Sequence, residues 1–272
     1  VDKAEAFNDY FTSVSSLSNE PETVHLNSRT TSSIENITVT ELEVVDQLKL
    51  LNSSKPAGPD HISPRILKNI IPSIKGPLTK LFNLSLTSKN LPFHWKRSNV
   101  TPIYKGKGDS SIPQNYRPIS ITSVVCKLLE KIVFKRLFNF IKENNLLCKE
   151  QSGFQPKDST VNQLIEIYNT ILYNLDKGKD IRFVFCDVAK AFDKVWHKGL
   201  LYKLDKYGIK GSLLKWIENY LCGREQKVVV EGYSSRSSIV ESGVPQGSVL
   251  GPFFFLLYIN DIVDNVTNPL RL

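Results

Sequence analysis

The stretch Ile181-Arg-Phe-Val-Phe-Cys-Asp-Val-Ala-Lys-Ala-Phe-Asp-Lys-Val-Trp-His-Lys-Gly-Leu200 decides how the rest of the sequence is interpreted. Its apolar run, residues 183–186, is typical of a strand that is buried on both faces, and it stops at Asp187. From Ala189 onward the apolar residues follow helical spacing. A carboxylate at a strand end suits metal-assisted phosphoryl transfer, because it can hold a hard cation over a cleft. The local pattern alone favours a plainer interpretation, in which Asp187 caps the helix and Phe192 is a core aromatic residue.

The whole chain has the composition of a globular protein. Of its 272 residues, 41% are hydrophobic and 10% aromatic, which excludes disorder throughout. Its 35 Lys and Arg residues outnumber its 27 Asp and Glu residues, and the net charge of +8 fits a polyanionic partner without establishing one. The four cysteines are far apart, so neither a zinc site nor a disulfide framework is supported, and a reducing interior is favoured.

The chain carries no recognisable export or membrane signal. No signal peptide opens it, and its longest apolar run, residues 253–259, is much shorter than the roughly 18 to 20 residues that a membrane span needs. We therefore expect an intracellular protein that is not secreted and has no membrane partner. The chain contains no Met, and we expect it to be a fragment of a longer protein.

A glycine-rich cationic loop joins two predicted strands, at residues 100–104 and 116–121. In this loop, Lys105 and Lys107 lie between glycines, which let backbone N–H groups approach an anion closely. Arg117 precedes a proline that holds it extended, so its guanidinium can reach the same place. The three cations are candidate ligands of a triphosphate, and a solvated hairpin tip is the alternative.

Apolar periodicity predicts that much of the remaining chain is helical. Two long helices with apolar stripes are expected in the core, and shorter helices precede and follow them. The predicted helices are 41–51, about 74–86, 125–141, 159–175, 198–207, 211–221 and 253–262. A β-hairpin is predicted over 228–240, around Gly232.

The stretch Ser242-Gly-Val-Pro-Gln-Gly-Ser-Val-Leu-Gly-Pro252 precedes the last apolar helix. Two glycines flank Pro245 and Gln246, which indicates a rigid turn where a flat substrate can lie against backbone, with the Gln246 side chain projecting toward it. A structural turn ahead of a buried helix explains the pattern equally well.

Taken together, these stretches resemble the reverse transcriptases of non-LTR retrotransposons, the LINE-type elements, and in particular their jockey-like and CR1-like groups. The matching motifs follow the family's order along nearly the whole chain, which makes their combination specific. They are Phe7-Asn-Asp-Tyr-Phe11, Lys55-Pro-Ala-Gly-Pro-Asp60, Pro102-Ile-Tyr-Lys-Gly-Lys-Gly-Asp109, Asn115-Tyr-Arg-Pro-Ile-Ser120, Gln151-Ser-Gly-Phe154, Asp187-Val-Ala-Lys-Ala-Phe-Asp193 and Gly243-Val-Pro-Gln-Gly-Ser-Val-Leu-Gly-Pro252. One departure is Pro156, which stands where the family more often has a basic residue.

The resemblance implies an α+β right-hand polymerase, with fingers and a palm built on a ferredoxin-like antiparallel sheet with helices. The implied division is an N-terminal arm or linker over 1–40, a helical N-terminal extension of the fingers over 41–98, the fingers over 99–180 and a partial palm over 181–272. The family's second metal motif, an aromatic-x-Asp-Asp sequence, does not occur before Leu272. We therefore expect an incomplete palm and no thumb.

The resemblance also implies roles for individual residues. Asp187 would bind magnesium through its carboxylate, and Val188 through its backbone carbonyl. Phe192 would lie under the sugar of the incoming nucleotide and reject a ribose 2′-hydroxyl by its bulk. The remaining assignments are Lys105, Arg117, Gln246 and Gly247 to the nucleotide, Lys107, Gln151 and Pro245 to the nucleic acid, and Lys190 and Asp193 to structural roles.

The implied reaction is in-line attack of a DNA primer 3′-hydroxyl on a deoxynucleoside triphosphate, directed by an RNA template and assisted by two Mg²⁺ ions. It requires that Asp187, the glycine-rich loop and the Pro245–Gln246 turn share one basin. Because the second metal motif is missing, we expect the fragment to be inactive and its parent to be a polymerase in nuclear and cytoplasmic ribonucleoprotein. The alternatives are a non-catalytic nucleic-acid-binding remnant and a pseudogene fragment, whereas Phe192 argues against an RNA-dependent RNA polymerase.

Overall fold

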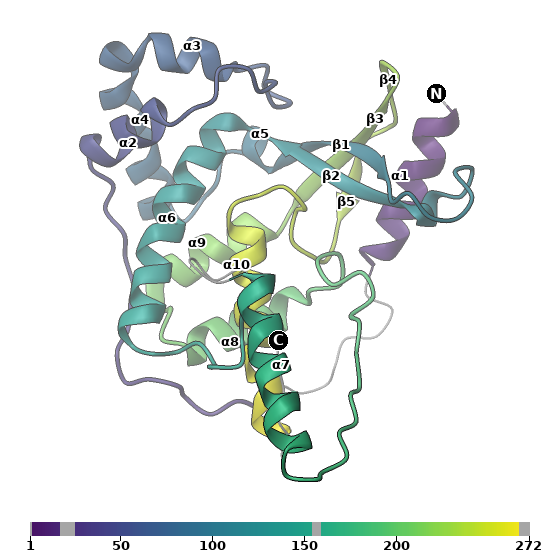
Figure 1. Cartoon of the computed structure of the whole chain (residues 1–272). Coiled ribbons are helices and arrows are strands. Elements are labelled where there is room, and N and C mark those ends of the chain that lie inside the picture. Colours follow the sequence, from purple (N-terminus) through teal and green to yellow (C-terminus); the bar gives the residue numbers. More distant parts are fainter. Residues whose placement is uncertain (1, 17–24, 154–158, 267–272) are drawn as a thin grey trace.

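The computed structural model describes residues 2–16, 25–153 and 159–266, which form helices and a five-stranded sheet (Figure 1). The helices are α1 (Asp2–Val14), α2 (Glu41–Lys49), α3 (Pro64–Asn69), α4 (Ile71–Ser88), α5 (Phe93–Lys96), α6 (Val124–Glu143), α7 (Thr160–Leu175), α8 (His197–Lys206), α9 (Gly211–Leu221) and α10 (Leu250–Ile259), with 3-10 helices η1 (Pro113–Asn115) and η2 (Asn260–Asn265). The strands are β1 (Arg97–Tyr104), β2 (Tyr116–Thr122), β3 (Arg224–Val230), β4 (Tyr233–Ser234) and β5 (Ser238–Val240). The fold is therefore of mixed α+β type, as the sequence predicts.

The sheet joins segments from both halves of the chain. Strands β1 and β2 form the predicted antiparallel hairpin, from the Ser98–Thr122 pair to the Tyr104–Tyr116 pair. Strand β1 also pairs in parallel with β3, which in turn pairs antiparallel with β4 and β5. The hairpin predicted around Gly232 is thus confirmed, and it lies beside the β1–β2 hairpin.

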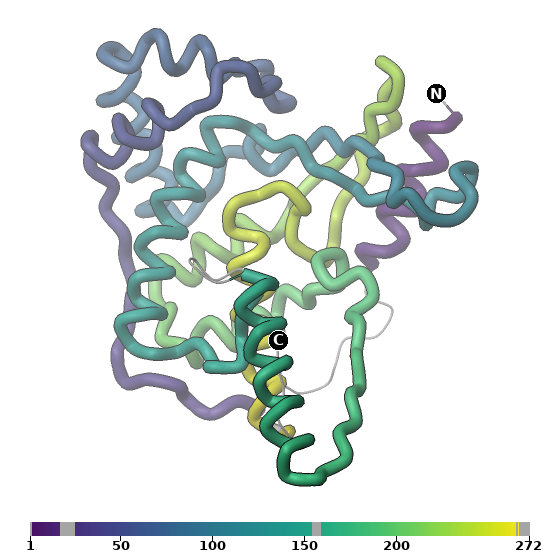
Figure 2. Tube along the Cα trace, in the orientation of Figure 1, coloured from purple at the N-terminus to yellow at the C-terminus, as the bar shows by residue number. Residues whose placement is uncertain are grey.

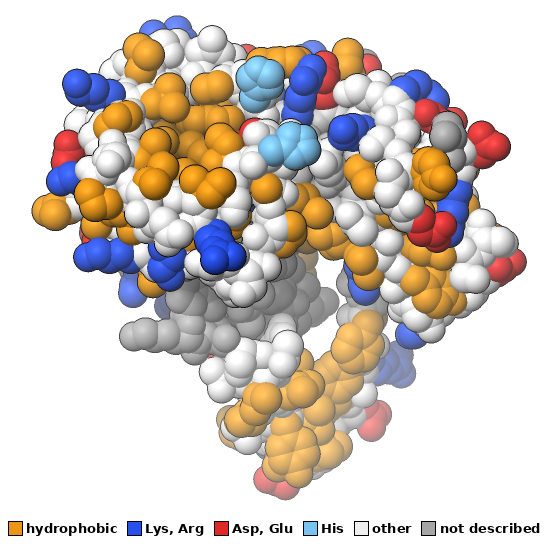
Figure 3. Space-filling view, turned by 90° about the horizontal axis from the view of Figure 1, so that it is seen from above, with side chains coloured by type: hydrophobic (Ala, Val, Ile, Leu, Met, Phe, Trp, Pro, Cys, Tyr) orange, Lys and Arg blue, Asp and Glu red, His pale blue; other side chains and the backbone are white. Residues whose placement is uncertain are grey.

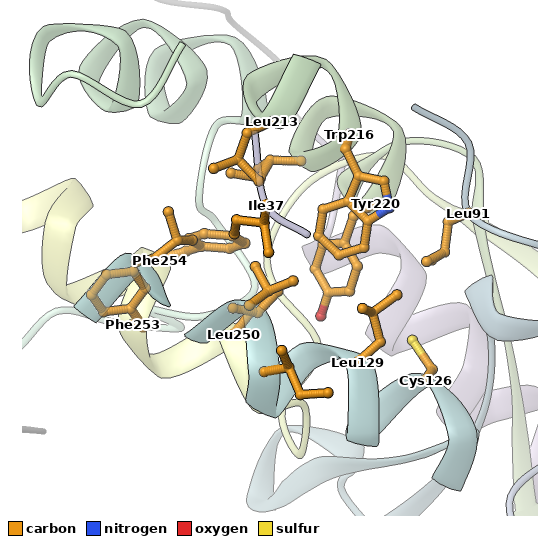
Figure 4. Close-up of a cluster of buried hydrophobic side chains, with 14 of the residues drawn as sticks. Ile37, Leu91, Cys126, Leu129, Leu213, Trp216, Tyr220, Leu250, Phe253 and Phe254 are labelled. Atoms are coloured by element: carbon orange, nitrogen blue, oxygen red, sulfur yellow. The ribbon is translucent and has the colours of Figure 1, made fainter. Parts of the chain in front are cut away.

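The main core lies where α6, α9 and α10 face one another, and Figure 4 shows their side chains pointing together. Trp216 and Tyr220 of α9 and Phe254 of α10 are fully buried. The Trp216 indole Nε1 also donates to the Ser85 Oγ of α4, over 3.0 Å. Because these contacts anchor α10, they also fix the turn that precedes it.

The two long amphipathic helices differ in how their apolar stripes are covered. The prediction for α6 is confirmed, since Leu128, Leu129 and Ile132 are buried in the core. The prediction that the α7 stripe lies in the core is wrong. Its members stay between 41% and 64% exposed, and they are Val161, Leu164, Ile165, Tyr168, Leu172 and Leu175. Periodicity identifies the apolar face of a helix, but no described element covers this one.

The strand predicted at residues 183–186 is absent, so the observed sheet does not contain the expected central palm strand. Residues 181–188 have no regular secondary structure, and the Phe185 side chain is 90% exposed. Figure 2 shows this segment running apart from the sheet after α7. A strand buried on both faces needs neighbouring strands and a layer on each side, and the described residues supply neither.

The helix predicted from Ala189 onward is also wrong. Residues 189–194 form turns, and Lys190 has a positive φ of 56°, in the left-handed region that interrupts a helix. Helix α8 begins instead at His197. The predicted helices at 198–207 and 211–221 are confirmed as α8 and α9.

Helix α1 packs onto the sheet. Its Phe7 and Phe11 form a small second core with Val100 of β1 and Val228 of β3. Asn8 is fully buried, and its Nδ2 donates to the Ser238 Oγ over 2.8 Å. The region predicted as an arm, residues 1–40, therefore begins with a helix that is part of the folded unit.

Over α3 and α4 the surface carries a group of apolar side chains with Lys and Arg at its edges (Figure 3). The exposed apolar residues of α3 and α4 and of the position between them include Ile66, Ile70, Leu81 and Leu84. In the described part of the chain, no helix is both long enough and apolar enough to span a bilayer.

Candidate functional site

A pocket of about 210 Å³ lies where the β1–β2 hairpin, α1 and the turn before α10 meet. Lys105 and Arg117 line it from the hairpin, and Pro245 and Gln246 line it from the turn. The structure thus brings together two of the three features that the sequence predicts to share one basin. They come from opposite halves of the chain, so only the tertiary fold can unite them.

The hairpin presents its two cations at the pocket by regular pairing. Lys105 follows β1, and its backbone N–H donates to the Asn115 carbonyl over 2.8 Å. The Lys105 Nζ donates to the Gln114 carbonyl over 2.7 Å. Arg117 pairs with Ile103 in the ladder. Both cationic side chains are exposed, whereas Lys107 lies on the loop and does not line the pocket.

The turn approaches strand β2 closely. The Ser120 N–H donates to the Gln246 carbonyl over 2.7 Å. Gly247 has a φ of 123°, and a Cβ added there would lie 2.5 Å from the Ser120 carbonyl oxygen. A glycine is therefore required by both conformation and space. The Gln246 side chain is also held, because its Nε2 donates to the Asp193 Oδ1 over 2.9 Å.

Glu130 of α6, which no sequence motif indicated as a site residue, fixes the other end of the turn. Its side chain is fully buried, and Oε2 accepts from the backbone N–H groups of Val249, over 2.7 Å, and Leu250, over 3.2 Å. A remote carboxylate thus caps α10, which suits the positive end of a helix dipole. The sequence signal was a Glu one turn from Cys126 and Val133, on the apolar face of the predicted helix.

Two titratable groups below the turn are perturbed by burial. Burial raises the pKa of the Asp193 carboxyl, against the opposing effects of the Gln246 hydrogen bond and of Lys190 and Lys105. Burial also lowers the pKa of His197, whose Nε2 lies 2.7 Å from the Gly243 carbonyl oxygen. The pocket is lined by the cations Lys105, Arg117, Lys190 and Arg224 and by the Asp193 carboxylate. Its electrostatic character therefore favours an anionic ligand.

Asp187 and Val188 lie outside this pocket. Both are exposed in the segment that fails to form a strand, so the predicted basin lacks its carboxylate. Among residues 2–16, 25–153 and 159–266, no group of three or more His, Cys, Asp or Glu side chains gathers as a metal site would. Two magnesium ions need more carboxylate ligands than Asp187 provides. The described residues therefore do not fit a complete two-metal site.

Phe192 and Gln151, the other predicted site residues, do not line the pocket. The Phe192 ring packs against the Phe255 ring of α10, with 5.1 Å between centroids, and its carbonyl accepts from the Val244 N–H over 2.8 Å. Gln151 is buried, and its Nε2 donates to the Gly153 carbonyl over 2.8 Å. Pro156 and Phe154 lie outside the described residues.

Comparisons with known proteins point to a single family. The sequence model of the family described as reverse transcriptase (RNA-dependent DNA polymerase) matches residues 103–270, more than half of the chain. The chain is 34% identical over 227 residues to the probable RNA-directed DNA polymerase from transposon BS of Drosophila melanogaster, covering 81% of the chain and 24% of that protein. It is 31% identical over 225 residues to the RNA-directed DNA polymerase from mobile element jockey of the same species, covering 82% and 24%.

A more distant similarity is to the retrovirus-related Pol polyprotein from type-2 retrotransposable element R2DM of Drosophila melanogaster. That alignment has 29% identity over 211 residues and covers 78% of the chain and 19% of that protein. The chain therefore spans about a quarter, or less, of the length of these curated relatives.

Proposed function

Because the chain belongs to the reverse transcriptase (RNA-dependent DNA polymerase) family, we propose that it is the nucleotide-binding part of an RNA-directed DNA polymerase from a non-LTR retrotransposon. In this proposal the pocket receives the triphosphate of a deoxynucleotide, while an RNA template and a DNA primer lie against the hairpin and the turn. The finer architecture belongs to the same proposal, with an N-terminal arm or linker over 1–40, a helical extension of the fingers over 41–98, the fingers over 99–180 and part of a palm over 181–272.

The observation that carries the proposal is the convergence of Lys105 and Arg117 with Gln246 at one pocket. A triphosphate carries several negative charges, and exposed cations at a pocket mouth attract and orient it. The planar Arg117 guanidinium can form two parallel hydrogen bonds with phosphate oxygens, and Lys105 adds a mobile point charge. These residues bind and orient the nucleotide.

The turn gives the pocket a rigid wall. Gln246 is fixed through its carbonyl by Ser120 and through its side chain by Asp193, so its position is set before a ligand arrives. A preorganised wall lowers the entropic cost of binding a flat base or sugar. Phe192, which packs behind the turn on Phe255, is proposed to limit space beside the sugar.

Magnesium, when bound, would neutralise charge on the triphosphate. Asp187 and Val188 are the residues of this chain proposed to contact it. In the parent protein they would act together with further carboxylates.

Nucleotide binding is the first test. Equilibrium dialysis with labelled dTTP would compare the unmodified chain with Arg117→Gln, Lys105→Gln and the control Lys80→Gln, whose side chain is exposed on α4. A lost charge-assisted hydrogen bond should weaken binding by about 10-fold in Arg117→Gln. Lys80→Gln should bind as the unmodified chain does. Equal affinity in all four proteins would refute the pocket assignment.

Primer extension tests the proposed reaction. The whole parent protein should extend a DNA primer on an RNA template, and Asp187→Asn in that protein should abolish extension. The 272-residue chain alone should be inactive, because its described residues gather too few carboxylates. Extension by this chain would contradict the proposed mechanism.

A non-catalytic role in nucleic-acid binding is the second candidate, because the cations gather at the pocket while Asp187 lies outside it. Binding of single-stranded RNA would then weaken steeply with salt and survive Asp187→Ala. RNA binding of this kind without any dTTP binding would favour the second candidate. Under the first, the parent protein is proposed to work in a ribonucleoprotein of the nucleus and cytoplasm.

A further inference from the structure

The pocket contains a buried cation that neither the sequence motifs nor the family resemblance assigned. Arg224 opens strand β3, directly after the glycine that ends α9, and pairs with Val240 of β5. Its side chain lines the pocket although the residue is only 4% exposed. An arginine is rarely buried to this extent unless its charge is paired.

The contacts of Arg224 leave part of its guanidinium unsatisfied. Nη1 donates to the Tyr220 carbonyl over 3.1 Å, and the guanidinium carbon lies 5.1 Å from the centroid of the Tyr220 ring. Nη2 is buried and has no hydrogen-bond partner among the described residues. The spare donor is therefore on the side chain that lines the pocket.

The Arg224 guanidinium has no carboxylate in direct contact with it among the described residues. Within the described ranges Arg224 forms no ion pair, and the buried Glu130 carboxylate is used by the N–H groups of Val249 and Leu250 and by the Cys126 thiol. Of the other charged side chains that line the pocket, Lys105, Arg117 and Lys190 are cations, and Asp193 is the carboxylate opposing them. An unpaired buried charge is unfavourable, so an anion that enters the pocket would offset a cost that the folded chain already bears.

We propose that Arg224 is a further ligand of the polyphosphate in this pocket: a rotation of its guanidinium would bring the buried Nη2 to the pocket surface, where it donates to phosphate oxygens opposite Lys105 and Arg117. This inference rests on the proposed nucleotide-binding function and adds a residue to it. A guanidinium matches phosphate oxygens in geometry and charge. The pocket is bounded by α1, the hairpin, β3 and the turn. The triphosphate group of a single nucleotide can enter a pocket that is bounded in this way. A continuous polynucleotide would instead need to enter the pocket on one side and leave it on another.

The matched control is Arg97, which opens β1 as Arg224 opens β3, in a neighbouring and paired strand. Its guanidinium is exposed, forms an ion pair with Glu225 and lies over the Phe93 ring. It does not line the pocket. Arg97→Gln therefore removes the same charge from the same sheet without touching the proposed site.

The experiment measures binding of inorganic tripolyphosphate by titration calorimetry, at a temperature where every variant is folded by circular dichroism. Arg224→Gln should weaken binding by about 10-fold or more, and Arg97→Gln by less than about twofold. Arg224→Lys keeps the charge without the planar fork, and should lose at least about threefold. It decides the question if Arg224→Gln does not fold.

Thermal unfolding adds a readout that a purely structural role would not give. Without tripolyphosphate, Arg224→Gln should unfold at the same temperature as the unmodified chain or higher, because it removes an unpaired buried charge. With tripolyphosphate, the unmodified chain should gain more stability than the variant. A lower unfolding temperature together with unchanged affinity would overturn the inference.

The outcomes also separate this inference from the proposed function. If Lys105→Gln weakens tripolyphosphate binding and Arg224→Gln does not, the function stands and the role of Arg224 is refuted. If the unmodified chain does not bind tripolyphosphate at all, both fail. If Arg224→Gln weakens binding of a short oligothymidylate but not of tripolyphosphate, the ligand is a nucleic-acid backbone and the inference is wrong.

Discussion

The pocket and the segment from α7 to Asp187 carry equally distinct sequence patterns, yet only the pocket is assembled. In the pocket, each piece has a partner from elsewhere in the chain, such as Ser120 for Gln246 and Glu130 for Val249. The second segment has a helix with an apolar stripe and a strand-like run, and both remain exposed. A sequence pattern therefore indicates which face of a segment can be buried. The tertiary contacts determine whether that face is buried.

This difference also explains why Asp187 is separated from the other residues of the predicted site. The hairpin cations and the turn are tied to the sheet and to α6, so their positions follow from ladder pairing and a buried cap. Asp187 depends on a strand, and a strand exists only with a neighbour to bond. Without that neighbour among the described residues, the carboxylate has no sheet edge to occupy.

The largest expected effect on stability comes from replacing one phenylalanine in each region by alanine. Phe254→Ala, in the core, should lower the free energy of unfolding by roughly 3 to 5 kcal/mol, from lost transfer energy and a cavity. Phe185→Ala should change it by less than about 0.5 kcal/mol, because this ring is 90% exposed. Urea unfolding followed by circular dichroism measures both.

A similar loss in the two variants would break the comparison. It would mean that the ring of Phe185 is buried in solution and that the strand predicted at 183–186 forms there. The slope of the urea transition should stay the same in Phe185→Ala, since the surface exposed on unfolding is unchanged.

Much of the fold follows from local sequence rules. The β1–β2 hairpin, α6, α8 and α9 were predicted within a few residues, because each combines a clear period with a turn or cap at its ends. The last helix was also predicted, although it begins earlier, at Leu250, and continues after Ile259 as a 3-10 helix. These elements depend on patterns that lie within the elements themselves.

The predictions that failed concern tertiary contacts, which hydrophobic periodicity does not specify. The apolar face of α7 was identified correctly, but hydrophobic periodicity does not specify which element will cover that face. The turn at Lys190, with its positive φ, breaks a helix that apolar spacing favoured. Both errors come from extending a local rule to a tertiary outcome.

The candidate site shows the same difference between what local sequence patterns predict and what only tertiary packing reveals. Lys105 and Arg117 were predicted to meet the Pro245–Gln246 turn, because the family's motif order and the chemistry of anion binding agree. Glu130 was missed, since a single charged residue in an apolar pattern is normally assigned to the surface. Arg224 was missed because it begins a polar run, Arg224-Glu-Gln-Lys227, which gives no sign of burial. Their burial becomes evident only when α6, α9 and β3 are packed together.

A smaller effect is expected from a methyl group added to a glycine in each region. Gly243 has a φ of 85°, and a Cβ there would lie 2.6 Å from the Phe192 carbonyl oxygen. Gly243→Ala should therefore lower the free energy of unfolding by roughly 2 to 4 kcal/mol, from strain plus overpacking. Gly178, after α7, has a φ of 67° and no atom within 4 Å of an added Cβ. Gly178→Ala should cost only about 1 kcal/mol, from strain alone.

Thermal and urea unfolding of the two alanine variants distinguish the cost of backbone strain from the cost of crowding. Equal losses would show that the crowding at Gly243 is relieved by movement of the turn. A loss for Gly178→Ala above that for Gly243→Ala would show that the end of α7 is packed in solution, and the contrast between the regions would be lost.

The smallest expected effect concerns the two aspartates of the Asp187–Asp193 motif, one exposed and one buried. Burial raises the pKa of Asp193 above its ordinary value of 3.8, so between the two pKa values the folded state binds more protons than the unfolded state. The contribution of this group to stability is therefore fully present below about 3.8 and is lost as the pH rises through its folded pKa. Asp193→Asn removes the buried charge and keeps an amide oxygen that can accept from Gln246. At about pH 7 this variant should be more stable than the unmodified chain, and its advantage should shrink as the pH falls through the folded pKa of Asp193 toward the ordinary value of 3.8.

Urea unfolding over this pH range measures that difference, with Asp187→Asn as the control because Asp187 is exposed. The control should follow the unmodified chain within about 0.5 kcal/mol at every pH. Using the difference between two chains cancels the acid response of all other groups. If the advantage of Asp193→Asn did not change with pH, or if Asp187→Asn showed the same trend, the buried position of Asp193 beneath the turn would be refuted. The contrast between the assembled pocket and the exposed segment would then no longer hold at the motif that connects them.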